Sequence, residues 1–139
     1  MLQPGPSLKG AFTLVELLVV IAVIGIMSAL VISSITNAAQ DSRFTVARQQ
    51  QATLQSALHS WIAAQESISQ ARTDYTAADA EEKLDLLTNY LQAETLADFI
   101  ANTSDTEVRS TVLDQIDHHL SFSAWSETSQ PSVTLSTNQ

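Results

Sequence analysis

A single carboxylate interrupts the most apolar stretch of this 139-residue chain. Residues 9–26 read KGAFTLVELLVVIAVIGI, and all residues from position 12 to 26 are apolar or small except Glu16. A carboxylate costs about 2.5–3.5 kcal/mol at the centre of a membrane helix and less near its end. Its side chain could therefore reach the membrane interface, or a partner cation could neutralise it. Because no Lys, Arg or His lies between Lys9 and Arg43, the segment itself holds no such cation.

Other side chains that could do chemistry lie near the C-terminal end. Asp114, Asp117, His118 and His119 are of the types that bind metals, but no spaced acidic loop typical of a calcium site surrounds them. We interpret them as a solvated helix end, and His59 as a solvated helix residue. The chain lacks cysteine, G-x-S-x-G, a phosphate loop and H-E-x-x-H. We expect no enzyme activity, metal, cofactor or small-molecule substrate.

The charge balance is strongly acidic. The chain has 6 Lys and Arg against 15 Asp and Glu, which gives a net charge of -9. Residues 73–139 alone hold two basic and twelve acidic residues. Such a surface repels phosphate backbones, so we expect no direct nucleic-acid partner.

The apolar segment over residues 12–36 is long enough to cross a bilayer. Its first 24 residues would span about 36 Å as an α-helix, against about 30 Å of bilayer core. Lys9 on the N-terminal side favours a single pass with the N-terminus in the cytoplasm and the rest outside. The alternative is a secretory signal peptide cut near Thr36-Asn37-Ala38. However, the apolar run before that point exceeds the usual 7–15 residues and contains an acid.

Helical periodicity continues beyond the apolar segment. We predict an outer, amphipathic half of the same helix over residues 37–72, and a small acidic head over residues 73–139. No Pro or Gly interrupts the chain between Gly25 and Pro131. The apolar positions recur at spacings of three and four, with Gln51 as one polar intrusion; they are Phe44, Ala47, Leu54, Leu58, Trp61 and Ile62.

The head pattern predicts short helices followed by a hairpin. Thr76 with Asp79, and Ser104 with Glu107, have the spacing of capping boxes before helices. The second helix would carry its apolar positions from residue 108 to 120. Apolar residues then alternate with polar ones over residues 120–124 and 132–136, with turn residues between them. The fold class expected is α+β, mainly helical, with a long N-terminal helix and a C-terminal β-hairpin.

The N-terminal motif resembles the class III signal of type IV pilins and type II secretion pseudopilins. That family has a short leader with a basic and a small residue, followed by Phe-Thr-Leu-x-Glu and an apolar helix. Here Lys9-Gly10-Ala11 precedes Phe12-Thr13-Leu14-Val15-Glu16. Residues 1–11 would be the leader. The family usually has Gly before the cut and Glu fifth in the mature chain. A cut between Ala11 and Phe12 keeps that spacing, whereas the alternative cut between Gly10 and Ala11 makes Glu16 sixth.

The resemblance implies a structural role in a filament of like or related pilin-like subunits. Prepilin peptidase would remove the leader and N-methylate Phe12, and Glu16 would pair with the Phe12 amine of a neighbouring subunit. The subunit would pass from the bacterial inner membrane, through an assembly platform there, into a periplasmic or surface filament. The small residues that could pack helices together are Ala22, Gly25, Ser28 and Ala29. Relatives often have Pro eight residues after the Gly that matches Gly25; this chain has Ser33.

Three assignments remain open at this point. The acidic, cysteine-free head suits a type II secretion pseudopilin, with a major or minor type IV pilin as the alternative. A monomeric membrane-anchored or secreted domain with a conventional signal segment is the third.

Overall fold

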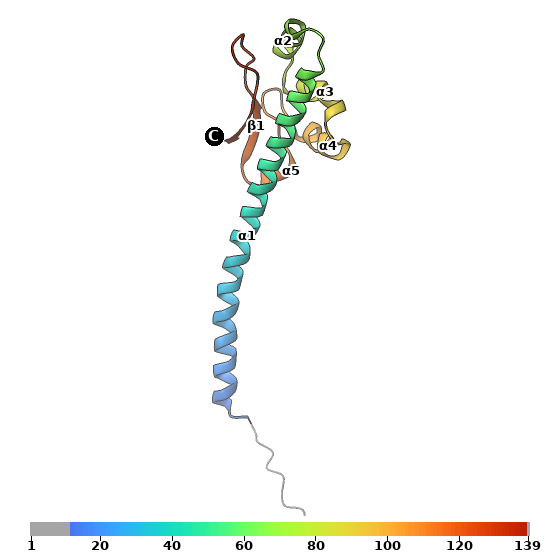
Figure 1. The fold of residues 1–139 in the computed structure, drawn as a ribbon. Helices are drawn as coiled ribbons and strands as arrows, with labels where there is room; N and C mark the ends of the chain where they lie inside the picture. The colour runs from blue at the N-terminus through green and yellow to red at the C-terminus, as the bar shows by residue number, and fades with distance from the viewer. Residues whose placement is uncertain (1–11, 139) are drawn as a thin grey trace, which may run out of the picture. The chain divides into compact units, whose positions relative to one another are not determined.

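The computed structural model describes residues 12–138, and its fold is α+β and mainly helical, as predicted (Figure 1). One long helix, four short helices, one 3-10 turn and one two-stranded sheet make up these residues. In chain order they are α1 (Leu14–Ala63), α2 (Ile68–Ala77), α3 (Ala80–Leu86), η1 (Thr88–Tyr90), α4 (Ala93–Asn102), α5 (Thr111–Gln115), β1 (His118–Phe122) and β2 (Val133–Thr137). The chain divides between Ala39 and Gln40 into two compact units.

Helix α1 runs without interruption for 50 residues and ends earlier than the sequence pattern predicts. The amides of Ala64 and Gln65 bond to the carbonyls of Trp61 and Ile62 in tighter turns, at 3.2 Å each. Ser67 then caps α2 by accepting a hydrogen bond from the Gln70 amide at 3.4 Å. Helix α1 therefore ends in tighter turns, and the serine cap begins α2, although no Gly or Pro marks a break.

Both predicted capping boxes in the head are wrong. Thr76 lies inside α2, and its hydroxyl donates to the Arg72 carbonyl at 2.6 Å. The box before α3 is formed by Asp79 and Glu82, in which each side chain accepts from the other residue's amide. Ser104 begins no helix, because its amide donates to the Glu107 carbonyl in a turn.

The segment after Glu107 is extended rather than helical. Val108 forms an isolated antiparallel bridge with Leu120, with reciprocal backbone bonds of 2.8 and 2.9 Å. The predicted helix over residues 108–120 is therefore reduced to the five residues of α5, which Ser110 caps. Strands β1 and β2 pair antiparallel, with Leu120 opposite Leu135. The hairpin is confirmed, but its first strand begins two residues before the predicted start.

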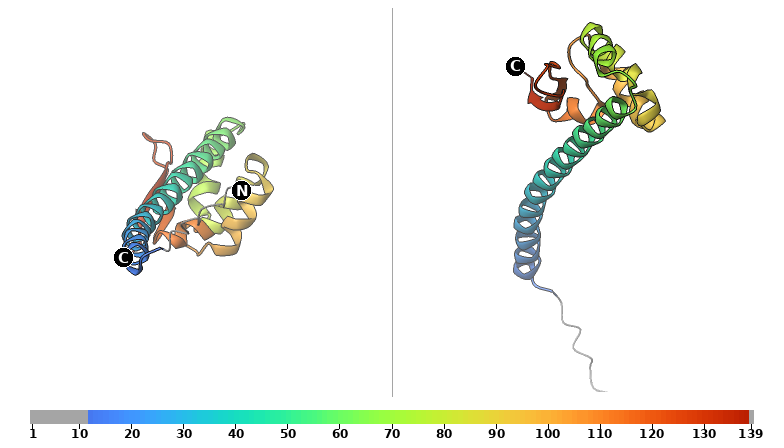
Figure 2. Two further views of the ribbon diagram at one scale, coloured as in Figure 1. Left: turned by 90° about the horizontal axis from the view of Figure 1, so that it is seen from below. Right: turned by 45° about the horizontal axis from the view of Figure 1, so that its top comes forward.

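The core of the second unit lies between the outer part of α1, the short helices and the hairpin. Figures 1 and 2 show the hairpin on one side of this part of α1 and helices α3 and α4 on the other. The α1 residues that enter the core repeat at helical spacing; they are Ala47, Leu54, Ala57, Leu58, Trp61 and Ile62. Phe44 remains partly exposed, and its ring lies edge-on to His118 with centroids 5.1 Å apart.

Aromatic side chains join the hairpin to the helices. Tyr75 is buried, and its hydroxyl donates to the Ser123 carbonyl at 2.8 Å. Its ring lies edge-on to Phe122 and Trp125, with centroids 6.3 and 5.7 Å away. Lys83 stands over the same ring with its Nζ 4.8 Å from the centroid. Burial raises the pKa of the Tyr75 hydroxyl above its ordinary value, so this side chain remains a neutral donor.

Candidate functional site

Thr13 and Glu16 form a reciprocal capping box at the start of α1. The Glu16 amide donates to Thr13 Oγ1 at 3.2 Å, and the Thr13 amide donates to Glu16 Oε2 at 3.0 Å. The Thr13 hydroxyl also donates to Glu16 Oε2, at 3.0 Å. Within residues 12–138 no donor reaches the second oxygen, Oε1. One carboxylate oxygen therefore caps the helix, and the other is open to a further donor.

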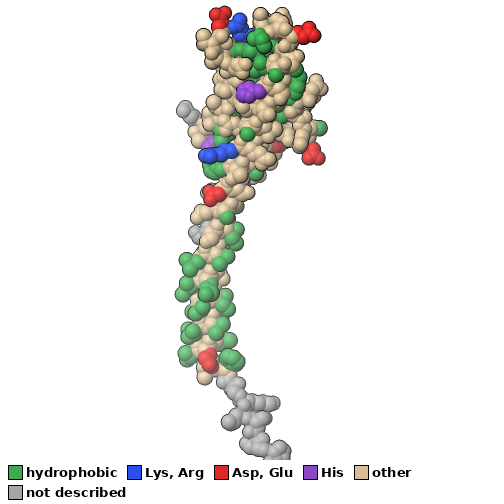
Figure 3. All heavy atoms as spheres, in the orientation of Figure 1, with side chains coloured by type: hydrophobic (Ala, Val, Ile, Leu, Met, Phe, Trp, Pro, Cys, Tyr) green, Lys and Arg blue, Asp and Glu red, His purple; other side chains and the backbone are tan. Residues whose placement is uncertain are grey.

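The part of α1 that follows the capping box is apolar and exposed on all sides. None of its most apolar stretch is buried against the rest of the chain. Figure 3 shows hydrophobic side chains along this segment. Within the described residues, α1 is the one helix long and apolar enough to cross a membrane. Such a surface needs lipid or other helices around it, because its exposure to water is unfavourable.

The small residues that the sequence analysis named for helix packing lie on the exposed part of α1. A Cβ placed on Gly25 would meet no other atom within 4 Å. Ser28 donates its hydroxyl to the Ile24 carbonyl at 2.7 Å, so its polar atom is satisfied within the helix. Ala22 and Ala29 are exposed on the same helix. Lys9, Gly10 and Ala11, and with them the predicted cut, lie outside the described residues.

The glutamines of α1 hold the hairpin, a role that the sequence analysis missed. Gln51 Nε2 donates to the Val133 carbonyl at 2.8 Å, and the Val133 amide donates to Gln55 Oε1 at 2.6 Å. Two side chains one turn apart thus satisfy both backbone groups at the start of β2. Gln50 Oε1 accepts from the buried Ser110 hydroxyl at 2.8 Å. The only available signal was the polar intrusion of Gln51 into an apolar helix face.

The interpretation of Asp114, Asp117, His118 and His119 as a solvated helix end is wrong for the two histidines, which belong to strand β1 and are half-buried. His118 Nδ1 lies 2.6 Å from the Ile116 carbonyl oxygen, and His119 Nδ1 lies 2.8 Å from Asn138 Oδ1. Asp117 has a left-handed backbone, with φ of 58°, and its carboxylate accepts from Asn138 Nδ2 at 3.1 Å. Among residues 12–138, no group of three or more His, Asp or Glu side chains is arranged to hold a metal ion.

Arg109 forms the main ion-pair cluster of the head. Its Nη2 lies 2.7 Å from Glu107 Oε2, and its Nη1 lies 3.4 Å from Asp114 Oδ1. His119 Nε2 is 3.9 Å from the other oxygen of Glu107. The hydrogen bond from Arg109 lowers the pKa of the Glu107 carboxyl below its ordinary value, against a smaller effect of burial. The cluster pairs these charges with one another and fixes the chain just before α5.

The long helix and its capped acid define a chain that presents an apolar helix to lipid or to other helices. Residues 7–32 match the family model of the prokaryotic N-terminal methylation motif, which is typical of type IV pilins and pseudopilins. No curated protein and no solved structure matches the chain. This motif followed by a long helix is the arrangement typical of type IV pilin-like subunits, which are structural proteins. The arrangement also implies processing by prepilin peptidase and membrane anchoring.

Proposed function

We propose that this chain is a structural subunit of a type IV pilus-like filament, and more narrowly a type II secretion pseudopilin. The observation that carries the proposal is the Glu16 carboxylate, which Thr13 holds with its Oε1 open, next to an exposed Phe12 at the start of the described chain. A cut between Ala11 and Phe12 creates an amine on Phe12, four residues before Glu16. Four residues correspond to about one helical turn.

Pairing between copies follows from that separation. Two parallel helices staggered by about one turn bring the amine of one copy level with the acid of the other. The capping box uses atoms of Thr13 and Glu16 only, so removal of residues 1–11 leaves it intact. Thr13 then positions the carboxylate, and Oε1 accepts from the neighbour's amine. Apolar burial changes little when a helix moves from lipid into a helical bundle, so this pair and close packing set the register.

Close packing is assigned to the small-residue face of α1. Ala22, Gly25, Ser28 and Ala29 recur at three- and four-residue spacing and let backbones approach. The pseudopilin assignment rests on the absence of cysteine and on the acidic head. Long surface fibres made mostly of this chain would contradict it and favour a major pilin.

Three variants separate the charge of Glu16 from its capping role. Glu16→Ala removes both, Glu16→Gln retains a capping side chain without charge, and Thr13→Ala retains the charge without the capping hydroxyl. We expect both Glu16 variants to insert in the membrane but to lose most of their filament assembly, because removing the acid leaves the neighbour's amine without its partner inside an apolar bundle. Thr13→Ala should have a smaller effect, because a lost cap costs about 0.5–2 kcal/mol.

The measurement is the amount of this chain in sheared or sedimented filaments, relative to the amount in the membrane. Normal assembly of Glu16→Gln would remove the pairing role and leave only the cap.

A further inference from the structure

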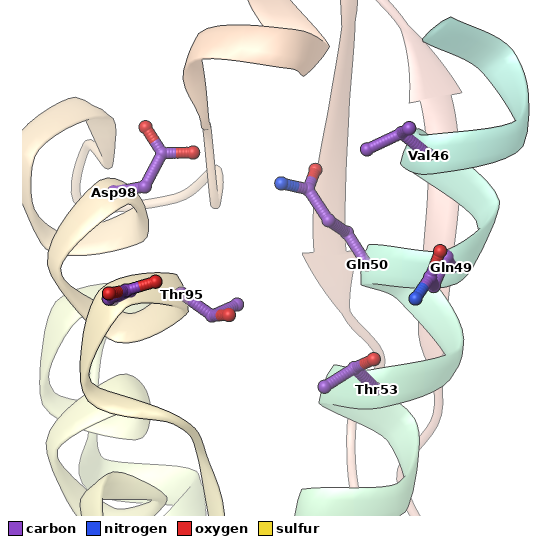
Figure 4. Close-up of a pocket in the computed structure, with 7 residues that line it drawn as sticks. Val46, Gln49, Gln50, Thr53, Thr95 and Asp98 are labelled. Carbon is purple, nitrogen blue, oxygen red and sulfur yellow. The ribbon is translucent and has the colours of Figure 1, made fainter. Parts of the chain in front are cut away.

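An acceptor-rich groove lies between α1 and α4 in the second unit. It has a volume of about 320 Å³ and is lined by Val46, Gln49, Gln50, Thr53, Glu94, Thr95 and Asp98. Figure 4 shows the α1 side chains facing Thr95 and Asp98 across the groove. Its polar groups are amides, hydroxyls and carboxylates, and no cationic side chain is among these residues.

The Asp98 carboxylate is held in place by hydrogen bonds from Thr111 and Asn102. Its Oδ1 accepts from the Thr111 hydroxyl at 2.7 Å, the Thr111 amide at 3.2 Å and Asn102 Nδ2 at 3.2 Å. No donor among residues 12–138 reaches Oδ2. Glu94 lies one turn earlier on α4, and its side chain is exposed. Two carboxylates with amide and hydroxyl acceptors beside them suit a cation with several donors, as a guanidinium is.

Arg48 has the complementary chemistry on the other side of α1. It is exposed and forms no ion pair within residues 12–138. It lies beside Gln51, Thr134 and Leu135, none of which is charged. Successive residues of an α-helix are rotated by about 100° around its axis. The Arg48 side chain therefore leaves α1 about 150° around the axis from the mean direction of the α1 residues that line the groove, which is nearly the opposite side.

We propose that Arg48 of one copy binds in the α1–α4 groove of the next copy, through Glu94 and Asp98. This inference rests on the proposed function, because it gives the filament its contact between heads. A patch and its complement on nearly opposite sides of one helix make a head-to-tail contact, which propagates instead of closing into a dimer. The groove runs along residues 46–53 of α1, which is about 10 Å of helix. Arg48 of a neighbouring copy can therefore reach it when the two parallel α1 helices are staggered by one to two turns.

Cysteine cross-linking of the full chain in membranes tests the contact without background, because the natural chain has no cysteine. The Thr134→Cys/Thr95→Cys variant keeps Arg48, Glu94 and Asp98, and places one cysteine beside Arg48 and the other in the groove. Treated with a short bismaleimide, it should give a ladder of dimers, trimers and larger species. A mixture of the two single variants should stop at dimers. Ala63→Cys/Thr95→Cys is the matched control, because Ala63 is exposed on α1 about 22 Å along the helix from Arg48; it should give no ladder.

Charge variants supply the second measurement. Arg48→Glu should lose most of its assembled fraction, whereas Arg43→Glu, the same change at another exposed position on α1, should retain it. Adding Glu94→Arg to Arg48→Glu should restore part of the loss. Absence of the ladder, or equal losses for the two arginines, would overturn the contact. The state of the N-terminus is read separately: a methylated Phe12 without a ladder rejects the contact and leaves the proposed function standing.

Discussion

At the scale of single residues, Thr13 and Glu16 show why a membrane helix would carry an acid near its start. The spacing of three residues closes a capping box, so the carboxylate has a structural role before any partner is present. The same spacing leaves Oε1 open for the amine that we propose as its second partner. The sequence led to the proposed pair, because the acid stood out among apolar residues. The sequence did not lead to the cap, because in an apolar stretch the insertion cost of Glu16 is a more prominent signal than its spacing from Thr13.

Glu107 gives a prediction about pH. Arg109 lowers the pKa of this carboxyl in the folded chain, so its contribution is fully present above the unfolded pKa and is lost as pH falls through the folded pKa. Glu107→Gln should therefore lower stability at pH 7 by about 1 kcal/mol or less, as for other partly exposed pairs. The difference from the natural chain should shrink as pH falls to about 3.

The free energy of unfolding at pH 7 and at pH 3 is measured by urea unfolding in detergent, for the natural chain and for Glu107→Gln. The fluorescence of Trp61 and Trp125 reports the transition. Glu66→Gln is the control, because Glu66 is exposed and forms no ion pair among the described residues. A difference that stays constant from pH 7 to 3 would show that Glu107 acts through its shape and not its charge.

At the scale of elements, the outer part of α1 holds the hairpin in place through side-chain hydrogen bonds to β2. Gln51 supplies a donor and Gln55 an acceptor to Val133, in the positions that a third strand would fill. A two-stranded sheet is marginal in water by itself. The side-chain bonds, the Val108 bridge and the buried face of the hairpin therefore replace a larger sheet.

The two glutamines should respond differently to the same substitution. Gln55→Glu retains an acceptor for the Val133 amide and should be tolerated, whereas Gln51→Glu places an acceptor against the Val133 carbonyl. We expect Gln51→Glu to cost about 1–3 kcal/mol, the penalty for an unsatisfied buried group. Urea unfolding at neutral pH measures the difference, with Gln49→Glu as the exposed control. Equal losses at positions 51 and 55 would contradict the assigned donor and acceptor roles.

The sequence predicted elements well where periodicity was long, and poorly where local signals competed. The apolar run and the alternation in the hairpin predicted the existence and type of α1, β1 and β2, but not the end of α1 or the start of β1. Ser104 and Glu107 match a capping box, but the pairing of Val108 with Leu120 keeps that segment extended. The conformation of this segment is therefore set by pairing with a residue twelve positions away, which a local sequence pattern cannot predict. The contacts of Gln51 and Gln55 could not be predicted either. A glutamine on a helix gives the same sequence signal whether its side chain bonds to water or to a backbone group.

At the scale of the whole molecule, the chain combines an apolar helix that needs neighbours with an acidic head that stays in water. Residues 73–139 carry twelve acidic residues against two basic ones, which discourages non-specific association of heads. Assembly must then depend on specific contacts: the proposed Glu16 pair at the start of α1 and the proposed Arg48 contact between heads.

The central claim, that the chain is a processed filament subunit, is tested most directly at the mature N-terminus. Purification from the native membrane, followed by N-terminal sequencing and intact mass measurement, identifies the first residue and any methyl group. We predict a chain that begins at N-methylated Phe12. A start at Ala11 would move the cut by one residue and retain processing. An intact Met1, or a start near Ala39, would contradict the account.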